Sequence, residues 1–202
     1  MTDTPPFDDL STLLSAISGG PGGSISPPIV QSSLFAFESF QAFADRMAGR
    51  SDTAIYTRVQ NPTVAAFEAM MAQAEGGEAA VGFASGMAAI SSTLLAVLKP
   101  GDTVACVENV YPDAYRFMER MLRPFGIATT YHPVSAFEDD PDLLAGVTVA
   151  YLESPSSIAL QAMNLPKVAA HARRHGVLTM IDNSWATPVF QRPLSLGIDI
   201  VI

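Results

Sequence analysis

The amino-acid sequence predicts an α/β domain in which a largely parallel sheet is covered by helices on both faces. Three observations lead to this prediction. Short apolar runs of strand length alternate with helical segments, a pattern typical of βαβ crossovers. Proline and glycine occur where one element must end and the next begin. Hydrophobic residues make up 49% of the chain, which is enough to bury a substantial core.

The expected helices have recognisable start and stop residues. A short helix is expected over 38–49. Asn61 and Pro62 begin the next one, which Gly76 and Gly77 end, because proline suits the first helical turn and glycine the end. Further helices are expected over 86–98, 111–125 and 166–175.

The expected strands are short apolar runs, often β-branched, between those helices. They lie at 79–83, 103–107, 127–132, 147–153, 177–182 and 199–202. The last run reaches the end of the chain, whereas chain ends normally lie at a protein surface, so we expect the first part of a longer polypeptide. Residues 1–33, rich in Pro, Gly and Ser, are expected to form an extended arm.

The charge balance argues against several classes of partner. The chain has 11 Lys and Arg against 20 Asp and Glu, a net charge of −9, and no basic cluster that could neutralise phosphates. Nucleic acid and membranes are therefore not expected as partners, and no metal site is predicted. No apolar run could span a bilayer and no secretory signal is recognised, so a cytoplasmic location is predicted. Cys106, the only cysteine, is expected to be a buried structural thiol.

Asp182 is the most informative single residue. It ends the apolar run 177–182 and is followed by a polar turn. Ligand crevices form outside the carboxyl ends of parallel strands, so an acid here is well positioned to meet a ligand. Such a carboxylate can keep the pyridine nitrogen of pyridoxal phosphate (PLP) protonated. An Asp that only caps the next turn is the alternative, and it is the commoner case for a lone residue.

The run Ser85-Gly86-Met87 joins a predicted strand to a predicted helix. Free N–H groups of Gly86 and Met87, together with the helix dipole, would favour an anion there. Ser85 could cap the helix and donate to a phosphate. An ordinary serine N-cap is the alternative.

Tyr56, Arg58 and Tyr111 are further candidates. Arg58 lies beside Tyr56 in a loop, and its planar guanidinium suits a phosphate, although a surface salt bridge is the alternative. Tyr111 follows the strand 103–107 and could lie over a planar ring, although it could also simply pack on the surface.

Together these segments resemble the Cys/Met-metabolism (transsulfuration) family of PLP-dependent enzymes. That family includes cystathionine β-lyase, cystathionine γ-synthase and γ-lyase, methionine γ-lyase and the homoserine-ester sulfhydrylases. The resemblance extends from about Pro27 to Ile202. Its blocks occur in order as Tyr56-x-Arg58-x-x-Asn61-Pro62-Thr63, Ser85-Gly86-Met87-Ala88, Glu153-Ser154-Pro155 and Asp182-Asn183-x-x-Ala186-Thr187-Pro188.

The resemblance implies a fold and a domain organisation. The fold would be the large domain of a fold-type-I, aspartate aminotransferase-like PLP-dependent transferase, with a mostly parallel seven-stranded sheet and helices on both faces. Residues 1–50 would form the arm and a short helix that make oligomer contacts. Residues 51–202 would form the first part of the PLP-binding domain.

It also implies roles for the candidate residues. Gly86 and Met87 would bind the phosphate of PLP, with Ser85 beside them. Tyr111 would stack on the ring and Asp182 would pair with its nitrogen, and both would serve catalysis. Three further residues would also contact the cofactor: Ser157, by a hydrogen bond to a ring substituent, and Tyr56 and Arg58.

The family is usually a homotetramer built from tight dimers. Tyr56 and Arg58 would then complete the site of the neighbouring subunit. Members hold PLP through a lysine, but Lys99 and Lys167 lie at helix ends and are expected to be exposed structural residues. By the resemblance, the PLP lysine is expected just after Ile202.

The subfamily signals conflict. Ser156-Ser157-Ile158, where Thr-Asn-Pro is frequent, and Trp185, where Phe is common, favour bacterial cystathionine β-lyases. The Tyr56-x-Arg58 block is instead common to the synthases and γ-lyases. We expect C–S bond cleavage by elimination on a cystathionine-like amino acid, the cystathionine β-lyase type.

Several alternatives stay open. Within the family they are γ-replacement, by a cystathionine γ-synthase or an O-acetyl- or O-succinylhomoserine sulfhydrylase, and a γ-lyase. Outside it are a non-catalytic paralogue or fragment and a nicotinamide-dependent dehydrogenase. The absence of Gly-x-Gly-x-x-Gly argues against the dehydrogenase.

Overall fold

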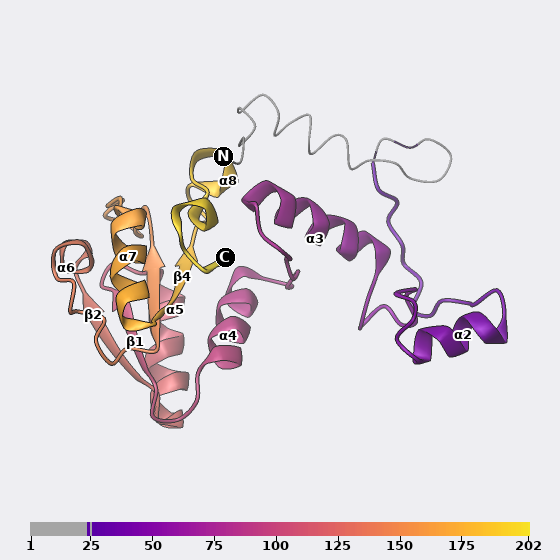
Figure 1. Ribbon diagram of the computed structural model, residues 1–202, viewed down its shortest axis with the longest axis horizontal. Helices are drawn as coiled ribbons and strands as arrows, with labels where there is room; N and C mark the ends of the chain where they lie inside the picture. The colour runs from indigo at the N-terminus through magenta and orange to yellow at the C-terminus, as the bar shows by residue number, and fades with distance from the viewer. Residues whose placement is uncertain (1–23, 25) are drawn as a thin grey trace. The chain divides into compact units, whose positions relative to one another are not determined.

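The computed structural model describes residue 24 and residues 26–202 (Figure 1). Most of the predicted arm, residues 1–23 and 25, lies outside the described part. The chain divides into two compact units. The first comprises the chain up to Ala74 together with Glu78–Gly82, and the second comprises Glu75–Gly77 and Phe83–Ile202.

The first unit contains helices α2 (Phe40–Met47) and α3 (Pro62–Glu75), close to the expected ranges. Ser39 caps α2 by accepting the N–H of Ala42. At the start of α3 the Asn61 side chain accepts the N–H of Thr63, at 2.8 Å. Both caps satisfy N–H groups that a helix start leaves without partners.

The strand expected over 79–83 does not form, and that prediction is wrong. A strand needs a neighbouring strand for its backbone hydrogen bonds. The sheet of the second unit has no strand from this segment. The N–H of Gly82 instead donates to the side chain of Glu68, at 2.8 Å. An apolar run of strand length is therefore left as irregular backbone.

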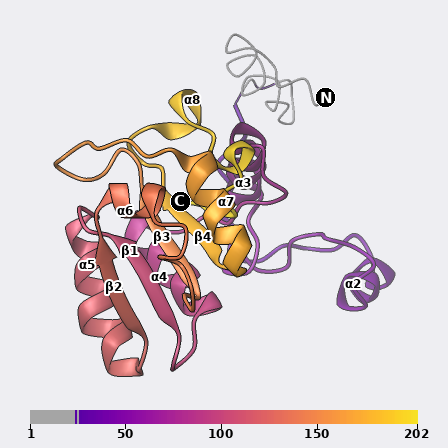
Figure 2. The same ribbon diagram turned by 60° about the vertical axis from the view of Figure 1, so that its left-hand side comes forward.

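The second unit is built on a parallel sheet of five strands in the order β2-β1-β3-β4-β5 (Figure 2). The resemblance implied seven strands for the whole domain, and the described residues form five. Every residue of β3 is buried, as expected for a central parallel strand covered on both faces. The strands are β1 (Thr103–Val107), β2 (Ala128–His132), β3 (Val149–Glu153), β4 (Leu178–Asp182) and β5 (Ile200–Val201).

Helices cover both faces of this sheet, as predicted. The chain moves from β1 outward to β2 and then back past β1 to β3 and β4. Because parallel crossovers are right-handed, this reversal puts α5 on one face and α6 and α7 on the other. The helices of the unit are α4 (Gly86–Val97), α5 (Pro112–Phe117), α6 (Val134–Asp139), α7 (Leu165–His175) and α8 (Thr187–Phe190), with 3₁₀ turn η4 (Pro193–Leu196).

The helix expected over 111–125 is not uniform. After α5 the chain forms a π-helical turn, η2 (Met118–Leu122), and a 3₁₀ turn, η3 (Arg123–Phe125). Pro124 has no N–H to donate to the preceding turn, so the regular α ladder cannot continue through it. The N–H of Ile127 then bonds to the carbonyl of Leu122, at 3.1 Å, and closes the segment.

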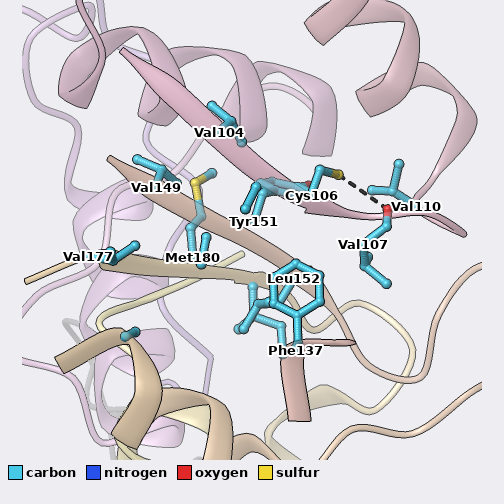
Figure 3. Close-up of a cluster of buried hydrophobic side chains, with 14 of the residues drawn as sticks. Val104, Cys106, Val107, Val110, Phe137, Val149, Tyr151, Leu152, Val177 and Met180 are labelled. Atoms are coloured by element: carbon cyan, nitrogen blue, oxygen red, sulfur yellow. Dashed lines mark hydrogen bonds between the residues drawn. The ribbon is translucent and has the colours of Figure 1, made fainter. Parts of the chain in front are cut away.

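The core lies between the sheet and its helices (Figure 3). Cys106, Tyr151 and Met180 are register partners on adjacent strands and so share one side of the sheet. Phe137 of α6 packs beside Leu152, on the other side. Cys106 is a buried free thiol, and burial raises its pKa, which fits the predicted structural role. Among the residues that the structure describes, no helix is both long and apolar enough to cross a bilayer.

Candidate active site

The candidate site lies at the carboxyl ends of β1, β3 and β4. The direction of the chain reverses between β1 and β3, because β1 leads outward to β2 and the chain returns to β3 on the opposite side of β1. In open α/β sheets such a reversal is where a ligand crevice forms. Tyr111 follows β1, Glu153 ends β3 and Asp182 ends β4.

Asp182 is nearly buried, with 9% of its surface exposed. Its Oδ1 accepts the N–H of Ser184 at 3.0 Å. The turn-capping alternative is therefore part of the structure, but it uses only one of the two carboxylate oxygens. Within the described part of the chain no hydrogen bond is formed to the other oxygen. The position leaves that oxygen available to a cationic ligand group.

Glu153 is the register partner of Asp182, so two carboxylates end adjacent strands side by side. Glu153 is 3% exposed. Its Oε2 accepts the backbone N–H of Tyr111 at 2.7 Å, and its Oε1 accepts the hydroxyl of Ser157 at 2.6 Å. Burial raises the pKa of Glu153, and the nearby Asp182 charge raises it further, against the lowering effect of these hydrogen bonds.

Sequence reasoning missed the role of Glu153. Glu153 was named only as part of the Glu153-Ser154-Pro155 block, and no role was assigned to its side chain. The available signal was the same one that identified Asp182, a single acid at the end of a mostly apolar run.

Tyr111 is held at two points. Its N–H is bound to Glu153, and its hydroxyl donates to Oδ2 of Asp113 at 3.1 Å. The hydrogen bond to Asp113 is the main reason that the pKa of Tyr111 is raised. Asp113 in turn pairs with Arg116. Tyr111 as a whole remains 41% exposed, so part of its surface is available to a ligand.

Ser85, Gly86 and Met87 form the N-terminus of α4. Ser85 caps the helix, and its Oγ accepts the N–H of Ala88 at 3.1 Å. The N–H groups of Gly86 and Met87 belong to the first turn, which has no intrahelical acceptors. Because α4 leads directly into β1, its N-terminus lies at the same end of the sheet as Asp182. A Cβ on Gly86 would meet no atom within 4 Å, so the backbone is open to a ligand.

Tyr56 and Arg58 belong to the first unit, whereas the other candidates belong to the second. Tyr56 and Arg58 contact one another. The guanidinium carbon of Arg58 lies 5.4 Å from the centre of the Tyr56 ring, a cation–π geometry. Val59 and Gln60 donate their N–H groups to the carbonyl of Tyr56, at 2.9 and 3.0 Å, and form a tight turn.

The chemistry of these groups suits PLP. A helix N-terminus could hold its phosphate, an exposed tyrosine face could lie against its ring, and a buried carboxylate could face its protonated nitrogen. The hydroxyl of Tyr151 is buried with no hydrogen-bond partner among the described residues, and the Asp182 charge contributes to raising its pKa after the larger effect of burial. The side of the sheet that carries Asp182 therefore has an unpaired polar group.

Comparison with known proteins identifies the class to which this fold and site belong. Residues 17–202 match the family model described as Cys/Met metabolism PLP-dependent enzyme. The chain belongs to this PLP-dependent family, which confirms the predicted family, fold class and cofactor.

Three similar proteins illustrate the range of the family. L-Methionine gamma-lyase of Pseudomonas putida is 36% identical over 182 residues, which cover 90% of this chain and 46% of the relative. Cystathionine beta-lyase MetC of Bacillus subtilis is 38% identical over 184 residues, covering 91% and 45%. The crystal structure of cystathionine gamma synthase from Xanthomonas oryzae pv. oryzae, in complex with aminoacrylate and cysteine, has a TM-score of 0.84 at 31% identity. It covers 95% of this chain and 49% of that one.

This chain thus spans about half the length of the proteins it matches. Their names divide between lyases and a synthase, so the similarity supports the transsulfuration family without choosing one activity.

Proposed function

We propose that the whole protein is a PLP-dependent carbon–sulfur lyase that cleaves a cystathionine-like amino acid by β-elimination. The observation that carries the proposal is the buried Asp182 carboxylate, which ends β4 with one oxygen left without a partner in the described chain. Family membership supplies the cofactor. PLP, when bound, accepts the electron pair released when a bond at the α-carbon of an amino acid breaks.

The proposed roles follow from the geometry of the second unit. Asp182 keeps the ring nitrogen protonated, because a carboxylate that is shielded from water interacts strongly with a nearby cation. The N–H groups of Gly86 and Met87 bind the phosphate, with the Ser85 hydroxyl beside them. Tyr111 would lie against the ring, and Ser157, which donates to Glu153, would face the ring substituents.

The first unit supplies the remaining contacts in this proposal. Tyr56 and Arg58 reach the site of a neighbouring subunit in a homotetramer. A planar guanidinium binds phosphate with two parallel hydrogen bonds, which suits Arg58 to the phosphate of PLP. A boundary near residue 50 between the oligomer-contact region and the PLP-binding domain remains a prediction.

Two sequence features support β-elimination over the other family reactions. They are Ser156-Ser157-Ile158 and Trp185, and the similarity to the Bacillus subtilis β-lyase agrees with them. A γ-elimination is the second candidate, because the Pseudomonas putida relative is a methionine γ-lyase of almost equal identity.

The test is to supply PLP and L-cystathionine to the whole protein and to identify the products. β-Elimination releases homocysteine, pyruvate and ammonia, whereas γ-elimination releases cysteine, 2-oxobutyrate and ammonia. We expect pyruvate. Asp182→Asn should lower turnover by about 100-fold, a typical loss for one electrostatic contact to the reacting group, while PLP absorbance is largely retained.

Three outcomes would count against the proposal. Release of 2-oxobutyrate would identify γ-elimination. Full activity of Asp182→Asn would remove the role assigned to that carboxylate. Absence of protein-bound PLP absorbance, after incubation with excess cofactor and removal of the unbound part, would favour the non-catalytic alternative.

A further inference from the structure

We infer that Glu153 is a positioning residue that ties the Tyr111 loop to the Ser157 loop across the point where the sheet reverses direction. The inference rests on the proposed function in one respect: it takes from it that Tyr111 and Ser157 both contact the cofactor. Glu153 itself does not have to touch it.

The two hydrogen bonds use both oxygens of one carboxylate. Oε2 accepts the N–H of Tyr111, which is 42 residues away in the chain, and Oε1 accepts the hydroxyl of Ser157, four residues away. Tyr111 follows β1 and Ser157 follows β3, so the carboxylate connects the loops on either side of the reversal. Removing the Glu153 carboxylate would remove both of these hydrogen bonds between the two loops.

Burial makes the link strong and specific. Glu153 is 3% exposed, so water cannot readily replace either partner, and hydrogen bonds to an ionised acceptor are stronger than neutral ones. An unpaired carboxylate at this depth would be costly, which explains why both oxygens are occupied.

The hydrogen bond from the N–H of Tyr111 to Glu153 controls the position of the Tyr111 backbone. Tyr111 is the residue immediately before α5, and its own side chain makes no capping bond to the helix. Its amide bond to Glu153 fixes the backbone, and the hydroxyl bond to Asp113 fixes the far end of the ring. The orientation of the ring therefore depends on two anchors, of which only the Glu153 anchor comes from another strand.

The arrangement predicts different effects for two substitutions. Glu153→Ala removes both acceptors. Glu153→Gln keeps the link, because its amide oxygen can accept from Tyr111 while its NH₂ group donates to the Ser157 oxygen. A residue that served only to place a negative charge near Asp182 would not be rescued by glutamine.

The experiment is amide hydrogen exchange of the whole protein without PLP, followed by titration with PLP. In Glu153→Ala the Tyr111 amide should exchange about tenfold faster or more, as expected when a protecting hydrogen bond is lost, and PLP affinity should fall by a similar factor. Glu153→Gln should keep most of the protection and most of the affinity. Ser157→Ala is the matched control, because it removes one bond of Glu153 and leaves the Tyr111 amide protected.

Exchange at the core amides of β3 reports whether a variant is folded. If the alanine variant does not fold, Glu153→Asp replaces it, because the shorter side chain keeps the charge but cannot span both partners. Unchanged exchange at Tyr111 in the folded alanine or aspartate variant would overturn the inference, as would a glutamine variant as deficient as alanine. A wild-type protein that binds no PLP would overturn the proposed function instead, and the exchange result would stand separately.

Discussion

Glu153 and Asp182 occupy equivalent places at the ends of adjacent strands, yet their surroundings differ. Asp182 accepts one backbone N–H and keeps an oxygen free of partners in the described chain. Glu153 has both oxygens occupied and a raised pKa, which burial causes. One carboxylate is thus available to a ligand, while the other is committed to the protein.

The raised pKa of Glu153 has a consequence for stability. A carboxyl whose pKa is higher in the folded than in the unfolded protein binds its proton more tightly when folded. Proton binding by Glu153 therefore contributes fully to the stability of the folded protein below the ordinary glutamate pKa of 4.5. This contribution is lost as the pH rises from 4.5 through the pKa of Glu153 in the folded protein. Glutamine at this position does not titrate, so the stability of a Glu153→Gln variant should not fall with rising pH for this reason.

We therefore expect Glu153→Gln to gain stability relative to the wild type as the pH rises from about 4 to about 8. Urea unfolding at several pH values measures the difference in unfolding free energy. Glu108→Gln, at an exposed position next to β1, controls for the removal of one negative charge. Parallel curves for the wild type and Glu153→Gln would show that burial does not perturb this carboxyl.

At the scale of elements, the start of α3 holds the described part of the arm. The Thr63 hydroxyl accepts the N–H of Val30 at 2.8 Å and donates to the carbonyl of Pro28 at 2.9 Å. The Asn61 side-chain amide donates to the carbonyl of Val30, also at 2.9 Å. The Asn61-Pro62-Thr63 part of the Tyr56-x-Arg58 block thus begins a helix. It also binds an extended segment about 30 residues earlier in the chain.

Thr63→Val should release this segment, because valine has nearly the same shape but can neither donate nor accept. We expect much faster exchange of the Val30 amide and a loss of unfolding free energy of about 1–2 kcal/mol, for two hydrogen bonds of ordinary strength. The same substitution at exposed Thr53, which makes no bond to the described part of the arm, should have little effect. Retained protection of Val30 in Thr63→Val would contradict the assignment.

At the scale of the whole molecule, the two units carry different parts of the proposed site. The first unit contains Tyr56 and Arg58, and the second contains Tyr111 and Asp182. If Tyr56 and Arg58 act in a neighbouring subunit, each active site draws on two chains. Defects on opposite sides of such a site can complement one another.

Mixing Arg58→Ala with Tyr111→Ala subunits, after dissociation and reassembly, should restore about a quarter of the sites. Half of randomly formed dimers would be mixed, and one of the two sites in each would have both residues intact. Mixing Tyr111→Ala with Asp182→Asn should restore none, because both residues belong to the same side of a site. No recovery in the first mixture would mean that Arg58 acts within its own chain or not at all.

Much of this architecture could be predicted from local patterns. The runs 103–107 and 177–182 are apolar and bounded by turns, so they correspond to β1 and β4 within a residue. Ser85, Asn61 and Gly176 mark helix ends through their own side chain or backbone, with Gly176 at φ +66°. Asp182 could be recognised because it ends an apolar run at the carboxyl end of a parallel strand, where ligand crevices form, and because the other motif blocks indicated the same cofactor.

The strand prediction that failed depended on a distant partner. Residues 79–83 have the composition of a strand, but composition does not supply a neighbouring strand, and the Gly82 N–H pairs with Glu68 instead. The helix predicted over 111–125 does form, but it changes from α to π and then to 3₁₀, and Pro124 has no N–H to continue a regular α ladder.

The sequence by itself determined the alternation of strands and helices, the places of the candidate cofactor residues and the resemblance to a PLP-dependent family, because each of these depends on residue type and spacing within short segments. Only the tertiary structure decided the strand order, the reversal between β1 and β3, and the partners of Glu153. These depend on which segments become neighbours when the chain buries its apolar surface, and a contact between residues 42 positions apart leaves no local pattern by which it could be predicted.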